Sequence, residues 1–190
     1  PFPEEKNREL IARLAHWHFA PTARTRENLM REGIATDRIH VVGNTVIDAA
    51  RWTQRHIQPA VFPALGAVPR GPATLLGAHP GSRLLLVTAH RRENWGPPIH
   101  NIATAVGRLL AEHSDLIVVW PLHPNPAVRA EVEPVIAGLE PGQRSRVCLT
   151  EPLDYSDMAP LMAASRLLAT DSGGLQEEGA ALAQGGLFWP

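Results

Sequence analysis

The chain has 190 residues, of which 44% are hydrophobic, and a formal net charge of −1. This length suffices for one ordinary domain or slightly more, with a real apolar core. Because no block of lysine and arginine is present, the charge gives no indication that a nucleic acid or an anionic membrane is the partner. No apolar run approaches the roughly 20 residues that cross a membrane.

Cys148 is the only cysteine, which excludes internal disulfides. A lone thiol is typical of a reducing compartment, so we expect a cytoplasmic protein. Because Cys148 lies in an apparent strand, we interpret it as a packing residue rather than as a nucleophile.

The first part of the chain predicts short strands between helices. Pro3 with the acidic Glu4 and Glu5 is typical of a helix start. Thr22 is a good cap for a second helix, which Gly33 ends. The expected strands cover residues 17–20 and 39–42, a third helix runs from about 45 to 56, and the Pro- and Gly-rich stretch 58–82 predicts a linker.

From residue 84 onward, short apolar strands alternate with helical patterns. The strands are expected at 84–87, 116–120, 147–149 and 167–169, and helical spacing covers 99–110, 128–135, 158–162 and a segment from about 175. This alternation predicts an α/β fold whose parallel sheet is covered on both faces.

Each of these strands ends in a polar run marked by proline or glycine. The runs are 88–94, 121–126, 150–155 and 170–178. Open parallel sheets bind ligands at the carboxyl ends of their strands. We therefore expect the ligand site at this edge, because four unusual runs coincide there.

The run from Thr170 to Glu178 carries the clearest chemistry. Ser172, Gly173 and Gly174 lie where a strand passes into a helix. The two glycines allow close approach of a ligand and φ angles that other residues resist. Free N–H groups of the first helical turn and the serine hydroxyl form a phosphate cradle, and Glu178, one turn further, suits sugar hydroxyls. Phosphate beside ribose indicates a nucleotide, and a plain tight turn is the structural alternative.

Other candidates are less specific. The run His90 to Asn94 combines groups that bind phosphate and move protons, but it also fits a solvated loop. His123 fits a structural hydrogen bond as well as a ligand contact. Leu153, Tyr155 and Met158 could line a base pocket, although apolar residues near a strand end are more often core. Taken alone, Glu4 and Glu5 are helix-start charges.

Several motifs are absent. The sequence has no G-x-G-x-x-G fingerprint, no P-loop, no C-x-x-C and no H-E-x-x-H, and its nine histidines show no ligand spacing. We therefore expect neither a redox cofactor nor a metal. Ser172 is not in a G-x-S-x-G elbow, which makes it a poor nucleophile candidate.

Taken in order, the motifs resemble those of the bacterial non-hydrolysing UDP-N-acetylglucosamine (UDP-GlcNAc) 2-epimerases. The resemblance runs from residue 1 to about residue 182, outside the stretch 58–82. The residues that carry it are Pro1 to Glu5 with Asn7-Arg8, Phe19 to Thr22, Gly43 to Thr45, His90 to Asn94, His123 to Pro126, Glu151 to Tyr155 and Thr170 to Glu178.

The resemblance implies a glycosyltransferase-B-type fold of two Rossmann-like domains. Residues 1–47 would be the tail of the first domain, and residues 48–190 an incomplete second, UDP-binding domain. The family interconverts UDP-GlcNAc and UDP-ManNAc for polysaccharide biosynthesis, by eliminating UDP to give 2-acetamidoglucal and then adding UDP back. The route needs no cofactor and no metal, and the full-length protein is expected to be a homodimer.

The resemblance also implies roles for single residues. Glu4 becomes a catalytic carboxylate, which reverses its helix-start interpretation, and His90 a catalytic group at the diphosphate. Arg91 and His123 correspond to a second, regulatory UDP-GlcNAc site. The expected UDP-binding positions are His90, Ser172, Gly173 and Gly174 at the diphosphate, Glu178 at the ribose, and Leu153 and Met158 beside the uracil, through backbone or shape.

The sequence departs from the family at both ends. The family's other catalytic Asp and Glu precede the position of Pro1, and a substrate-binding arginine that follows in the family is missing after Gln184. We therefore expect a piece truncated at both ends and inactive alone. The alternatives are a hydrolysing epimerase, against which Arg91 and His123 argue, a non-catalytic UDP-sugar-binding module, and a glycosyltransferase of the same fold.

Overall fold

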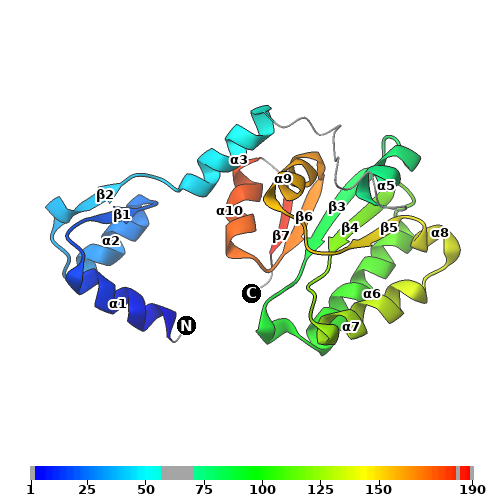
Figure 1. Cartoon of the computed structure of the whole chain (residues 1–190), viewed down its shortest axis with the longest axis horizontal. Coiled ribbons are helices and arrows are strands. Elements are labelled where there is room, and N and C mark those ends of the chain that lie inside the picture. Colours follow the sequence, from blue (N-terminus) through cyan, green and yellow to red (C-terminus); the bar gives the residue numbers. More distant parts are fainter. Residues whose placement is uncertain (1–2, 57–70, 183–184, 189–190) are drawn as a thin grey trace. The chain divides into compact units, whose positions relative to one another are not determined.

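The computed structural model describes residues 3–56, 71–182 and 185–188. Its helices and strands are labelled in Figure 1. The chain divides into two compact units, Pro1–Thr45 and Val46–Pro190.

The first unit combines a pair of parallel strands with two helices. In this unit Thr22 caps the second helix as predicted, because its side chain accepts a hydrogen bond from the Thr25 N–H at 3.1 Å. A small core joins Ala12, Ala20, Ile34 and Ile39. The elements are α1 (Glu4–Leu14), β1 (His18–Ala20), α2 (Ala23–Arg31), the 3-10 turn η1 (Thr36–Arg38) and β2 (Ile39–Val41).

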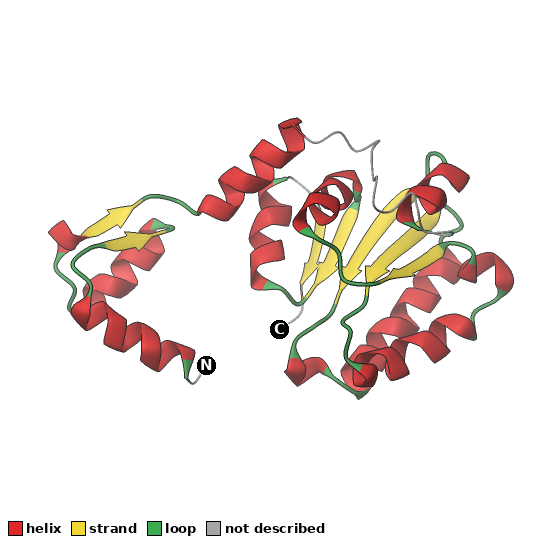
Figure 2. Cartoon of the chain, in the orientation of Figure 1, coloured by secondary structure: helices red, strands yellow, loops and turns green. Residues whose placement is uncertain are grey.

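The second unit is built on a five-stranded sheet in the order β5-β4-β3-β6-β7. All neighbouring strands in it are parallel, and Figure 2 shows them in yellow between the helices. The strands are β3 (Arg83–Thr88), β4 (Leu116–Pro121), β5 (Val147–Thr150), β6 (Leu167–Thr170) and β7 (Gly185–Phe188).

Helices cover both faces of this sheet. Successive residues of a strand point to opposite faces, so Leu85 and Val87 pack with α6 and α7, whereas Leu84 and Leu86 pack with α5 and α9. The helical elements are α3 (Thr45–His56), α5 (Pro72–Ala78), the 3-10 turn η2 (Arg92–Asn94), α6 (Pro97–Glu112), α7 (Pro126–Ala137), α8 (Pro141–Arg144), α9 (Tyr155–Ala164) and α10 (Gly173–Ala181).

The predicted α/β fold with a covered parallel sheet is confirmed, and each of its four expected strands is found within one residue at either end. The expectation of a linker over residues 58–82 is wrong where the structure describes that stretch. Pro72 occupies the first turn of α5, where a missing N–H costs nothing. Leu75 is buried against the sheet, so packing stabilises this short helix. Residues 57–70 lie outside the described part.

The strand order creates a switch point between β3 and β6. The chain leaves β3 toward β4 and β5 on one side, and then returns to β6 and β7 on the other. Connections leave the sheet in opposite directions on either side of such a point, and open parallel sheets bind ligands at the carboxyl ends of the strands that flank it. The segments after Thr88 and after Thr170 meet there.

Candidate functional site

Hydrogen bonds join the ends of β3 and β6 at the switch point. Thr88 lies opposite Thr170 in the register, and their buried hydroxyl oxygens are 2.6 Å apart. The Thr170 hydroxyl oxygen also accepts a hydrogen bond from the Ser172 N–H at 2.9 Å. The backbone at the start of α10 is therefore held against the end of β3.

Asp171 connects the two segments more strongly. Its side chain is fully buried, and its carboxylate accepts hydrogen bonds from the backbone N–H groups of His90 and Arg91, at 3.0 and 2.9 Å, and from Asn94 Nδ2, at 3.1 Å. Asp171 was not among the residues predicted from the sequence. It directly follows a buried strand, and the strand parallel to that one is followed by the His90 run. That position is the signal in the sequence that could have identified it.

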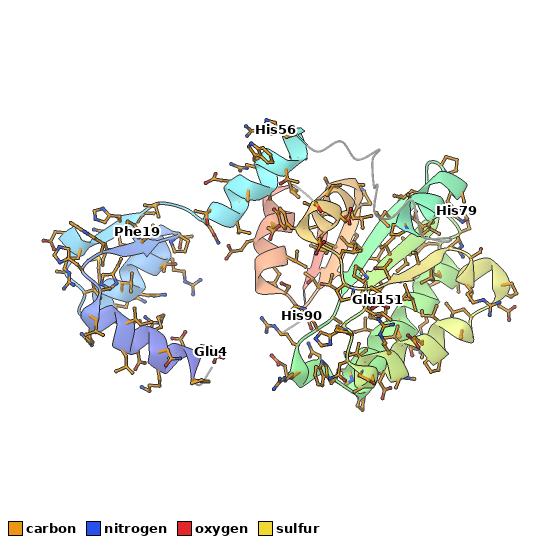
Figure 3. All side chains as sticks on the ribbon, viewed as in Figure 1. Glu4, Phe19, His56, His79, His90 and Glu151 are labelled. Atoms are coloured by element: carbon orange, nitrogen blue, oxygen red, sulfur yellow. The ribbon has the colours of Figure 1, made fainter. Side chains whose placement is uncertain are left out.

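His90 lies in the loop after β3, at the end of the sheet where Figure 3 labels it. Its ring Nδ1 is 2.8 Å from Asp171 Oδ1, and its side chain is 49% exposed. An imidazole that is anchored on one side and open on the other can contact a ligand at this end of the sheet. The structure thus brings His90 into contact with Asp171, the residue before Ser172, at the strand ends where the site was expected.

The segment Ser172 to Gly174 has the features of an anion cradle. Ser172 caps α10, with its hydroxyl oxygen 3.4 Å from the Leu175 N–H, and Gly173 and Gly174 are exposed. Neither glycine has a positive φ, so the expectation that glycine is needed here for an unusual φ angle is wrong. A Cβ at Gly173 would meet nothing within 4 Å. What the glycines provide is open access to the helix N-terminus.

Glu178 is buried in the next turn of α10, with 5% of its surface exposed. Its Oε2 has no hydrogen-bond partner among the described residues. Burial raises the pKa of this carboxyl above its usual range, and a hydrogen bond from Tyr155 opposes that shift. A buried carboxyl oxygen without a partner is a ready acceptor for hydroxyl groups.

Leu153 and Met158 are half-buried and pack against the core between the sheet, α5 and α9. Leu153 also lines a cavity of about 380 Å³, together with Pro72, Arg129 and Leu149 at the end of β5. Their contacts fit the core interpretation, and their role beside a uracil stays a prediction.

Arg91 follows His90 in the loop after β3, and His123 contacts this loop through Trp95. The Trp95 indole N–H donates a hydrogen bond to the His90 carbonyl oxygen at 3.4 Å, and the Trp95 and His123 rings are 5.7 Å apart. His123 Nδ1 accepts a hydrogen bond from the Asn125 N–H at 3.1 Å. This contact is the structural hydrogen bond that was one of the two interpretations of His123. It leaves Nε2 of the neutral ring to act as a donor.

Glu4 belongs to the first compact unit of the chain. It is an exposed residue in the first turn of α1, in the first unit. The other predicted site residues belong to the second unit. Its catalytic role therefore stays a prediction.

Three further features of the described residues concern metal ligands, the Cys148 thiol and membrane-spanning helices. Over residues 3–56, 71–182 and 185–188, the side chains form no group of three or more metal ligands. Burial raises the pKa of Cys148 to about 11, which agrees with a packing role. In the same part of the chain, every helix is too short or too polar to span a bilayer.

The order of the parallel strands, with the switch point between β3 and β6, defines a Rossmann-like α/β protein. The family model described as UDP-N-acetylglucosamine 2-epimerase matches residues 1–185. The chain belongs to this family. The match also confirms the resemblance stated from the motifs.

Relatives and solved structures agree with this assignment. A Bacillus subtilis UDP-N-acetylglucosamine 2-epimerase is 40% identical over 96% of this chain and 43% of its own length. The S. aureus MnaA–UDP structure superposes with a TM-score of 0.81 at 37% identity, covering 99% of this chain and 47% of the other. The Neisseria meningitidis UDP-GlcNAc 2-epimerase bound to UDP-GlcNAc gives a TM-score of 0.79 at 35% identity, covering 99% and 48%. The chain thus spans less than half the length of these proteins, and for that part the glycosyltransferase-B-type class is confirmed.

Proposed function

We propose that this chain is the UDP-binding part of an enzyme that interconverts UDP-GlcNAc and UDP-ManNAc. The observation that carries the proposal is that His90 contacts Asp171, the residue directly before the Ser172 cap of α10, at the switch point of the sheet. Family membership supports the substrate class, because relatives of known structure bind UDP or UDP-GlcNAc.

In this proposal the cradle binds the diphosphate. The diphosphate oxygens accept hydrogen bonds from the N–H groups at the start of α10, from the Ser172 hydroxyl and from His90. Glu178 accepts hydrogen bonds from the ribose hydroxyls, which its unpartnered Oε2 favours. Leu153 and Met158 border the uracil. Arg91 and His123 bind a second, regulatory UDP-GlcNAc.

The proposed reaction is elimination followed by re-addition. A base removes the proton from C2 of the sugar as the bond between C1 and the UDP oxygen breaks, which gives 2-acetamidoglucal and UDP. UDP then adds back while a proton reaches the other face of C2. Donors fixed around the diphosphate stabilise the departing charge, and Glu4 is one of the acid–base groups at the sugar.

Calorimetric titration of the chain with UDP tests the binding role. We expect saturable heat with the unsubstituted chain and an affinity at least about 10-fold lower for His90→Gln, because a hydrogen bond to a charged group contributes about 1.5–3 kcal/mol. His100→Gln is the matched control, since His100 is an exposed residue of α6 paired with Glu131 at 3.3 Å. Absence of heat at millimolar UDP would contradict the proposal.

Product analysis of a full-length protein that carries this chain tests the reaction. UDP-ManNAc formed from UDP-GlcNAc supports epimerisation. Free ManNAc and UDP instead indicate the hydrolysing alternative. A cytoplasmic location and a homodimer of the full-length protein stay predictions.

A further inference from the structure

Asp171 is a buried charge that has no role in the proposed phosphate cradle or in the ribose contact. Removing a carboxylate from water is costly unless hydrogen bonds replace its hydration. Asp171 is 0% exposed, and its oxygens have donors from two backbone N–H groups, one side-chain amide and the His90 ring. So complete a set of partners indicates that the carboxylate has a defined task.

The donors also settle which atom carries hydrogen in the contact with His90. The N–H groups of His90 and Arg91 and the NH₂ group of Asn94 are donors, and an ionised carboxylate, which can only accept, offers both of its oxygens to them. His90 Nδ1 is 2.8 Å from Asp171 Oδ1. Hydrogen bonding at that distance requires that Nδ1 carries the hydrogen in both charge states of the ring.

We propose that Asp171 is a positioning residue that holds His90 in the Nδ1–H tautomer, so that Nε2 faces the diphosphate. Nε2 is then the ring atom that gains and loses a proton. It donates a hydrogen bond to a phosphate oxygen when the ring is protonated, whereas in the neutral ring it is an acceptor that the deprotonated diphosphate cannot serve. The diphosphate assignment rests on the proposed function, whereas the tautomer does not.

The same carboxylate links the histidine to the cradle. Asp171 directly precedes Ser172, and its bonds to the backbone of His90 and Arg91 fix the loop after β3 against the start of α10. A purely structural clamp would need these backbone contacts alone. The additional contact with the imidazole is what distinguishes a positioning role.

Nitrogen-15 NMR of the imidazoles in the full chain tests the proposal without UDP. At alkaline pH, where the ring nitrogen shifts no longer change with pH, those shifts identify the tautomer of the neutral ring. The signals of His90 are assigned by their loss in His90→Gln. We expect hydrogen on Nδ1, and hydrogen on Nε2 would overturn the proposal.

Asp171→Asn adds a test of cause. Its amide oxygen can still accept from the backbone N–H groups, while its NH₂ group faces Nδ1 and favours the Nε2–H tautomer. We expect the dominant tautomer of the neutral ring to change from Nδ1–H to Nε2–H. Asn94→Ala is the control, because it removes a donor to Asp171 but leaves the imidazole contact, and it should retain the Nδ1–H form.

Three outcomes decide the matter. A folded Asp171→Asn chain that keeps the Nδ1–H tautomer overturns the proposal. If that variant does not fold, the tautomer of the unsubstituted chain decides alone. A chain that shows the expected tautomers but no UDP binding retains the Asp171 role and contradicts only the proposed ligand.

Discussion

At the scale of single residues, Glu178 lies where its charge is disfavoured. Burial raises the pKa of this carboxyl above its ordinary 4.5, so the folded chain binds the proton more tightly than the unfolded chain does. Protonated Glu178 makes its full contribution to the free energy of unfolding below about pH 4.5. This contribution is lost as the pH rises through the pKa that Glu178 has in the folded chain. At neutral pH the ligand-free chain therefore holds a carboxyl whose ionised form is destabilised by burial.

Glu178→Gln should stabilise the ligand-free chain at pH 7, because the neutral amide is not penalised by burial. The gain in free energy of unfolding should disappear near pH 4, where the carboxyl of the unsubstituted chain is itself neutral. Urea denaturation at both pH values measures this, with Glu112→Gln, an exposed position of α6, as control. An equal gain at both pH values would refute the electrostatic cause.

The same substitution should weaken UDP binding. A neutral acceptor forms a weaker hydrogen bond with the ribose than a carboxylate does, and a loss of about 1 kcal/mol corresponds to about fivefold in affinity. Calorimetry at pH 7 measures it. Higher stability together with unchanged UDP affinity would remove Glu178 from the proposed site.

At the scale of elements, the close packing of α10 on β6 positions the cradle. A Cβ added at Gly179 would lie 2.9 Å from Leu168 Cδ2, and Leu168 is fully buried in the core. Leu168 therefore has little room to move, and α10 can approach the sheet this closely only with glycine at that position.

Gly179→Ala should shift α10 and destabilise the chain by about 1–3 kcal/mol, which is typical of overpacking. Gly77→Ala is the matched control, because Gly77 also lies in a helix and its Cβ would meet nothing within 4 Å. The control should gain up to about 1 kcal/mol from helix propensity. Thermal denaturation of both variants compares them, and equal stabilities would contradict tight packing at Gly179.

At the scale of the whole molecule, local patterns predicted the strands of the sheet and the passage from β6 into α10 at Ser172. They failed where distant residues decide the outcome. Asp171 meets His90 because β3 and β6 are neighbours, although 81 positions separate the two residues in the sequence. In the same way, α5 forms in a Pro- and Gly-rich stretch because Leu75 packs against strands that come later.

If UDP binds at the switch point, a crystal structure of the chain with UDP will show it there. We expect the diphosphate against the N–H groups of Gly173 and Gly174 and beside His90 Nε2, with the ribose hydroxyls on Glu178. UDP bound elsewhere, for example in the cavity beside Thr150 and Leu153 with the α10 cradle empty, would contradict this expectation.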